Sequence, residues 1–289
     1  MIHTLLVPML QNIALAMIAV GISGTDGATS RGASPEASLY LTQSAQRILE
    51  VGEQLEYKVS YAIFNLGRIV IRITDKEERN GRIVYRAKAI IDSAPGLPFV
   101  NLHIRFTSEF DEDLFSYQWV AEDSTEDEIA MRRLSFDYEH NRVFVEKGKK
   151  QPDGSFLIES IDTSVITDKC QDGFSLFYFA RRHVLQKKVM NVPTFIEKKQ
   201  VNTFFNFTNT IEEEEIDSVD YPIEVVDFEG RADFVGVFGL TGGFQGRFTN
   251  DEARVPIVAW MNVILGSIKV TLWRWDRPGW TAPRYQEQD

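Results

Sequence analysis

Between residues 53 and 280 the chain repeatedly alternates hydrophobic and polar side chains, which is the two-residue period of a β-strand with one buried face. The pattern is clear in residues 55–63, where Leu55, Tyr57 and Val59 share a face opposite Glu56 and Lys58. Further alternating runs occupy residues 69–74, 83–89 and 102–107. Asn80-Gly81 separates two of these runs, and this dipeptide is a strong signal for a hairpin turn.

One segment, residues 172–189, has helical spacing instead. Residues three and four apart share an apolar face that also carries one arginine: Phe174, Phe177, Tyr178, Arg181 and Leu185. Asp172 is suited to cap the start of the helix, and Lys187 and Lys188 suit its negative end. About a dozen strands, one main helix and no internal break predict an all-β fold in a single antiparallel domain, residues 48–280.

The N-terminal residues have a different composition. Residues 5–24 are almost wholly apolar, but Pro8, Gln11 and Asn12 interrupt the run and small residues follow it. This pattern predicts a signal peptide over residues 1–28, with the cleavage site left open between Ser23 and Ser30 and an uncleaved anchor as the alternative. We expect a flexible linker at 29–47 and a disordered tail at 281–289.

The expected signal peptide indicates export to the periplasm or outer cell envelope. No cysteine lies near the expected cleavage region, so a lipoprotein is not expected. After cleavage the remaining chain has no segment that we expect to span a membrane stably.

Three stretches together resemble a family of exported bacterial proteins, the domain of unknown function 3108. They are the opening at 51–73 with Gly52-Glu53 and Gly67, the aromatic helix at 172–185, and the closing stretch at 249–272 with Asp251, Arg254, Pro256 and Gly266. The resemblance covers about residues 48–273. It implies a large curved antiparallel sheet or open half-barrel that wraps a helix, similar to periplasmic lipoprotein carriers. The family offers no catalytic residues to carry over, and this chain departs from its pattern in a weak signal n-region and in unusually acidic segments.

Composition narrows the function further. The formal net charge of −11 disfavours binding to nucleic acid, because an acidic chain is repelled by the phosphate backbone. The single cysteine, Cys170, excludes an intramolecular disulfide and a cysteine-based zinc cluster. Acidic runs at 109–115, 121–128 and 211–217 lack the ligand spacing of a calcium loop, so we expect solvated loops there and neither a metal nor a cofactor.

No catalytic motif is evident. The chain has no Gly-x-Ser-x-Gly sequence, and its four histidines are widely separated. A protein that is not an enzyme is therefore expected. A hydrolase that uses His103 or His183 with a carboxylate stays open as a further hypothesis.

The aromatic helix is the best candidate for binding. If it lies in the concavity of a curved sheet, Phe174, Phe177 and Tyr178 offer an apolar surface to an acyl chain, and Arg181 offers a cation to an anionic head group. Arg254, in the charged corner 249–254, is either part of a turn or a ligand contact. These features predict a binding module for a lipid, another amphiphile or an envelope polymer.

The alternative is that the same aromatic side chains simply fill the core. The chain would then be a structural or interaction protein that docks an envelope partner, through its sheet edges or through the apolar loop at 94–99.

Overall fold

The computed structural model describes residues 48–97, 101–125, 127–232, 240–263 and 266–287. The predicted signal peptide and linker, residues 1–47, lie outside them, as do Pro98 and Phe99 of the apolar loop. Fourteen antiparallel strands form one sheet: β1 (Gln54–Tyr61), β2 (Phe64–Arg79), β3 (Arg82–Ser93), β4 (His103–Asp111), β5 (Ser116–Ser124), β6 (Ile129–Asp137), β7 (Arg142–Lys150), β8 (Phe156–Val165), β9 (Lys188–Ile196), β10 (Lys199–Glu214), β11 (Ile223–Ala232), β12 (Leu240–Thr249), β13 (Pro256–Val263) and β14 (Ser267–Asp276). The α-helix among the described residues is α3 (Gly173–His183).

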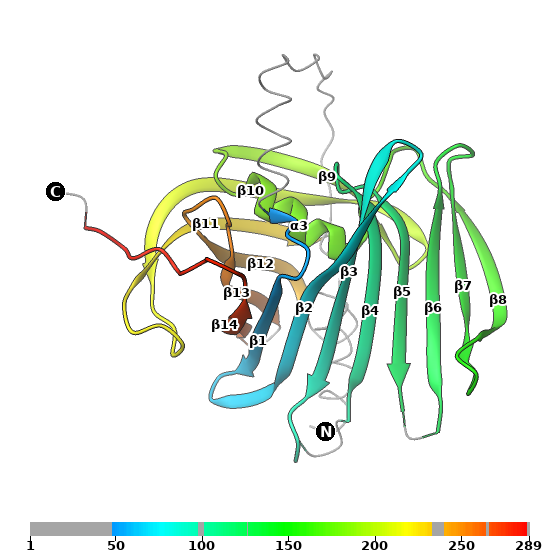
Figure 1. Cartoon of the computed structure of the whole chain (residues 1–289), viewed down its shortest axis with the longest axis horizontal. Helices are drawn as coiled ribbons and strands as arrows, with labels where there is room; N and C mark the ends of the chain where they lie inside the picture. The colour runs from blue at the N-terminus through cyan, green and yellow to red at the C-terminus, as the bar shows by residue number, and fades with distance from the viewer. Residues whose placement is uncertain (1–47, 98–100, 126, 233–239, 264–265, 288–289) are drawn as a thin grey trace.

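Strands that follow one another in sequence pair with each other, except that β8 and β9 do not pair and β1 and β14 do. β14 pairs with β1 from Asp276 opposite Gln54 to Ile268 opposite Tyr61, so the first and last strands lie in the middle of the sheet. The two edges are β8 and β9, which are consecutive strands joined through α3. Figure 1 shows the sheet curving around this helix. The predicted all-β class and open, curved antiparallel sheet are confirmed.

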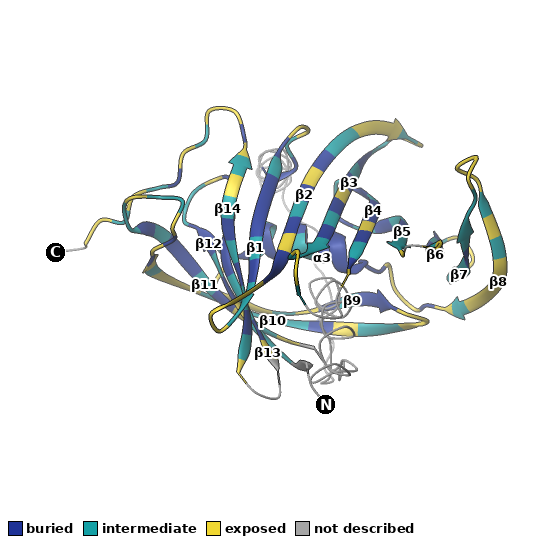
Figure 2. Cartoon of the chain, turned by 90° about the horizontal axis from the view of Figure 1, so that it is seen from below, coloured by how far each residue is buried: buried dark blue, intermediate teal, exposed yellow. Residues whose placement is uncertain are grey.

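The edges approach each other at one corner only. Ser164 Oγ, near the end of β8, donates a hydrogen bond of 2.6 Å to the carbonyl of Lys198, in the β9–β10 turn. Lys198 also forms an ion pair of 2.5 Å with Asp162. β8 itself is exposed over most of its length (Figure 2), with Ile161 and Val165 open to solvent. The sheet therefore stays open rather than closing into a barrel.

The turn between β2 and β3 confirms the hairpin predicted from Asn80-Gly81. Asn80 and Gly81 have φ angles of +53° and +75°, as a two-residue hairpin turn between β2 and β3 requires. Asn141 and Gly154 also adopt positive φ in the turns that flank β7. Because Asn and Gly tolerate this left-handed region, these turns are readable from the sequence.

Three local predictions need correction. The helix ends at His183 rather than 189, because residues from Lys188 onward extend as β9 to pair with β10. Parts of the acidic runs lie in β4, β5 and β10 rather than in loops, and the Asp111 side chain is fully buried beside Arg82. Residues 283–285 are not a free tail: the N–H of Glu224 donates to Pro283 and that of Tyr285 to Pro222.

Gly67 in β2 allows β2 and β3 to approach closely. Its φ is +154°, and a Cβ there would lie 2.2 Å from the carbonyl oxygen of Asp92. We expect Gly67→Ala to lower the free energy of unfolding by about 3 kcal/mol, because backbone on both strands must shift. Urea unfolding measures the change. The control is Gly81→Ala, where a Cβ meets nothing within 4 Å; it should cost only about 1 kcal/mol. Equal costs at both positions would contradict the close approach.

Candidate functional site

The start of α3 is fixed to the sheet by a buried carboxylate. Asp172 caps the helix and accepts hydrogen bonds from the N–H groups of Phe174 (2.6 Å) and Ser175 (2.9 Å). Ser108 Oγ of β4 donates to its other oxygen at 2.5 Å, and Ser116 Oγ of β5 accepts from the Asp172 N–H at 2.7 Å. Burial raises the pKa of Asp172, and these hydrogen bonds offset only part of that shift. The helix N-terminus is therefore tied to two strands.

The other end of α3 is held by Arg181, whose side chain is fully buried. Its guanidinium donates to both carboxylate oxygens of Glu53, at 2.6 and 3.0 Å. It also donates to the carbonyl oxygens of Ala253 (2.9 Å) and Arg254 (3.1 Å). Arg277 pairs with the same Glu53. This cluster ties α3 to β1 and to the β12–β13 corner.

The charges in this cluster support each other. Burial acts to raise the pKa of Glu53, but Arg181 and Arg277 outweigh burial and hold that pKa below its ordinary value. Burial likewise acts to lower the pKa of Arg181, yet Glu53 keeps it above its ordinary value. Both groups are therefore charged at neutral pH, and each is compensated by the other.

The charged corner at 249–254 is a turn. Asp251 Oδ1 accepts from Thr249 Oγ1 at 2.7 Å and from the Arg254 N–H at 2.8 Å, and Trp280 Nε1 donates to Oδ2 at 2.7 Å. Arg254 has a φ of +47°, and its guanidinium donates to the carbonyl oxygen of Arg182. The turn thus presents the two carbonyl groups that receive Arg181.

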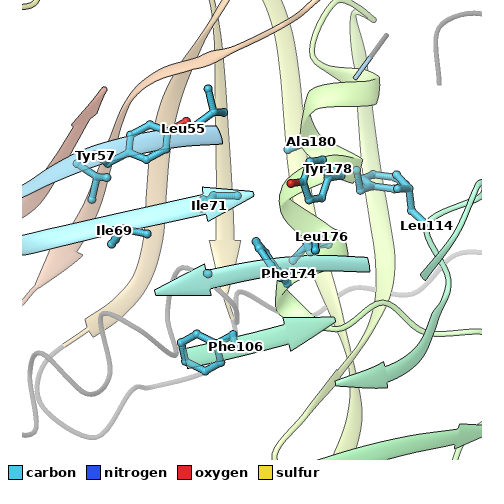
Figure 3. Close-up of a cluster of buried hydrophobic side chains, with 14 of the residues drawn as sticks. Leu55, Tyr57, Ile69, Ile71, Phe106, Leu114, Phe174, Leu176, Tyr178 and Ala180 are labelled. Carbon is cyan, nitrogen blue, oxygen red and sulfur yellow. The ribbon is translucent and has the colours of Figure 1, made fainter. Parts of the chain in front are cut away.

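An apolar cavity of about 140 Å³ lies between α3 and the inner face of the sheet. Among its described lining residues, Tyr57 alone has a polar side-chain atom, and the Tyr57 hydroxyl is directed to the carbonyl oxygen of Pro256 at 3.2 Å. The rest of the lining is apolar: Gly173, Phe174, Leu176, Phe177 and Ala180 from α3; Ile69, Ile71, Ala89 and Ile91 from β2 and β3; Phe205, Phe228, Phe244, Phe248, Pro256, Val258, Ala259, Met261 and Val270 from β10 to β14. Figure 3 shows part of the cluster where helix and sheet meet.

The structure brings two of the five predicted ligand contacts into this lining, Phe174 and Phe177. Tyr178 is buried outside the lining and packs against Phe110, with ring centroids 5.4 Å apart. Arg181 and Arg254 also lie outside it, in the contacts given above. The missed lining residues include four phenylalanines on β10 to β12, Phe205, Phe228, Phe244 and Phe248. The sequence predicted the strands that carry them, but it did not show that they face α3.

The other residues considered for chemistry lie apart from the cavity. His103 contacts Asp92 on the sheet surface. Burial lowers the pKa of His183 to about 4, and its ring lies 4.3 Å from that of Phe179. Burial raises the pKa of the Cys170 thiol to about 12, so that sulfur is a poor nucleophile at neutral pH. Among the described residues, no three His, Cys, Asp or Glu side chains are grouped as a metal site.

The family resemblance is confirmed by a family model. The model of the family described as "Protein of unknown function (DUF3108)" matches residues 56–272. A β-barrel-like protein of domain of unknown function DUF1849 from Brucella abortus is similar over 78% of this chain and 97% of its own, at 11% identity and a TM-score of 0.45. A putative exported protein with a YmcC-like fold from Bacteroides fragilis is similar over 79% and 97%, at 10% identity and a TM-score of 0.32. No curated protein matches.

Within the described part of the chain, α3 is too short and too polar to cross a bilayer, and no other helix there could do so.

Removing the charge of Glu53 should be costly. We expect Glu53→Gln to lower the free energy of unfolding by about 3–5 kcal/mol, because Arg181 would remain charged, buried and uncompensated. Urea unfolding gives the value. The control, Asp162→Asn, breaks an ion pair whose side chains are about half exposed; it should cost about 0.5 kcal/mol or less. A Glu53→Gln cost no larger than that of the control would show that the buried pair does not hold α3.

The same pair predicts a pH dependence. The pKa of Glu53 in the folded protein lies below the ordinary value of 4.5. The stability that ionised Glu53 gives the fold is therefore complete at pH values above 4.5, and it is lost as the pH falls through the pKa of the folded protein. The difference in unfolding free energy between wild type and Glu53→Gln should be constant from about pH 7 to pH 5 and narrow below pH 4.5. A difference as large at about pH 3 as at pH 7 would refute the assignment.

Proposed function

The chain belongs to the DUF3108 family, and from the cavity under α3 we propose that it is a non-enzymatic protein of the cell envelope that binds an apolar chain, such as the acyl chain of a lipid or another amphiphile. The observation that carries this proposal is the cavity of about 140 Å³ with its nearly all-apolar lining. Empty apolar cavities of about 150 Å³ stay dry and take up small hydrophobic molecules. Water is therefore a poor occupant, and the end of a hydrocarbon chain is a good one.

Rigid surroundings support the same function. Each strand that lines the cavity pairs with a neighbour on both sides, and α3 is attached at both ends by buried hydrogen bonds. Relaxation that would fill the space has to break these contacts, so the cavity persists without a ligand. A preformed apolar site of this kind needs little ordering when it binds.

The ligand should be recognised by its chain rather than by its head group. Arg181 was the expected partner of an anionic head group, but its donors are directed to Glu53 and to two carbonyl groups. No described residue of the lining carries a charge. A negatively charged and a neutral amphiphile with the same chain should therefore bind equally well.

The apolar N-terminal residues 5–24 support export, and with it a lipid-rich setting for this site. The alternative function, an interaction protein with a packed core, predicts that no apolar ligand binds.

Binding is measured with cis-parinaric acid, whose fluorescence rises when its chain is buried. Ala259→Leu adds a larger side chain to the cavity wall, so affinity should fall about tenfold or more. Stability should stay equal or increase, because new apolar contacts replace empty space. The same substitution at Ala130, an exposed residue of β6, is the control and should change neither property.

The methyl ester of the same fatty acid tests the role of the cations. It should bind within about twofold of the free acid, since no charged side chain lines the cavity. A strong preference for the acid would show that an arginine contacts the head group. Failure of both probes to bind wild type would reject the proposed function in favour of the interaction protein.

A further inference from the structure

The turn between β1 and β2 exposes two adjacent apolar side chains. Ile63 is 91% exposed and Phe64 61% exposed. The turn also places Ala62 at a φ of +49°, in the left-handed region that Asn or Gly occupies at lower cost. Neither burial nor turn geometry explains these residues, because a polar Asn-Gly pair would suit this position better on both counts.

Ile63 and Phe64 lie on the same side of α3 as the cavity. α3 is attached near Glu53, at the start of β1, whereas the β1–β2 turn is at the opposite end of that strand. Figure 1 shows this separation, with α3 toward the top and the turn at the bottom. Cavity residue Met261 pairs with Ile268 of β14. Ile268 in turn lies opposite Tyr61, the last residue of β1 before the turn. The cavity therefore lies between the helix and the end that carries the turn.

The two turns at the ends of β2 differ in polarity. The β2–β3 turn, at the far end, is surrounded by charged side chains: Arg79 pairs with Glu77 and Glu109, and Arg82 pairs with Asp111 and Asp113. The β1–β2 turn instead presents Ile63 and Phe64 to solvent. This difference would bring the β1–β2 turn, rather than the β2–β3 turn, to an apolar surface.

We propose that Ile63 and Phe64 insert into the surface of a lipid bilayer, a step that rests on the proposed function because it places the cavity next to the source of its ligand. A protein partner fits the pair less well. An aromatic side chain buries about 150–250 Å², whereas a stable protein interface takes about 800 Å² from each partner. A bilayer needs no matching surface, since each apolar side chain partitions into it separately.

Site-directed fluorescence tests this insertion in the full chain. An environment-sensitive label (NBD) is attached to Ile63→Cys and, as control, to Val165→Cys, which is 78% exposed on β8. The native Cys170 thiol is fully buried, so it stays unlabelled. Vesicles of phosphatidylethanolamine and phosphatidylglycerol in a 3:1 ratio should raise emission about threefold at position 63 and leave position 165 unchanged. No change at 63, or an equal change at both positions, overturns the proposal.

A second pair of variants separates this surface from the cavity. Phe64→Ser should weaken vesicle binding about tenfold relative to Ile161→Ser, whose side chain is 60% exposed on β8. Both variants should bind cis-parinaric acid as wild type does, because neither residue lines the cavity. If vesicle binding depends on Phe64 but no variant and no wild-type protein binds the fatty acid, the proposed ligand is rejected and the proposed insertion into the bilayer stands. Equal vesicle binding by the two variants would reject the membrane surface alone.

Discussion

The ion pair between Arg181 and Glu53 determines where the helix lies. Both side chains are almost completely buried, so their hydration is lost and has to be replaced by partners in fixed positions. Glu53 and the carbonyl groups of Ala253 and Arg254 supply those partners from two places in the sheet. A helix displaced along its axis would leave a buried guanidinium without them. The pair therefore fixes position more than it adds net stability, and the space beneath α3 is a consequence of that position.

The open sheet follows from the same attachment. The segment from β8 to β9 runs through the interior as α3, with its first turn tied to β4 and β5 and its last to β1. Closing the barrel would require β8 and β9 to pair along their length, but they are joined through a helix held inside the sheet. The two edges instead meet at the corner where Ser164 contacts Lys198. The edge of β8 is thus exposed because the helix is held inside the sheet.

Sequence patterns predicted what depends on neighbouring residues. Alternation located the strands, Asn80-Gly81 located a turn, and Asp172 located the start of the helix, because each rests on local geometry. The role of Arg181 depends on Glu53, 128 residues away, and helical periodicity gives no information about such a partner. An arginine on an apolar helix face is equally consistent with a ligand contact and with a buried ion pair. The early end of α3 escaped prediction similarly, since pairing of β9 with β10 overrides the helical preference of residues 185–189.

The cavity itself arises from the shapes of the side chains around it. On β10 to β12, phenylalanine rings pack against one another, as in the parallel stack of Phe205 and Phe207 with centroids 5.3 Å apart. Glycines make room for them: a Cβ on Gly230 would meet the ring of Phe244, and one on Gly246 the ring of Phe228. Rings held against the backbone in this way cannot swing inward to meet the shorter Ile71 and Ala89 across the interior. An aliphatic core on both sides could repack to fill the gap, whereas rigid rings on one side and a fixed helix above leave it open. The space that a hydrocarbon chain would occupy is in this sense specified by the residues that form the core.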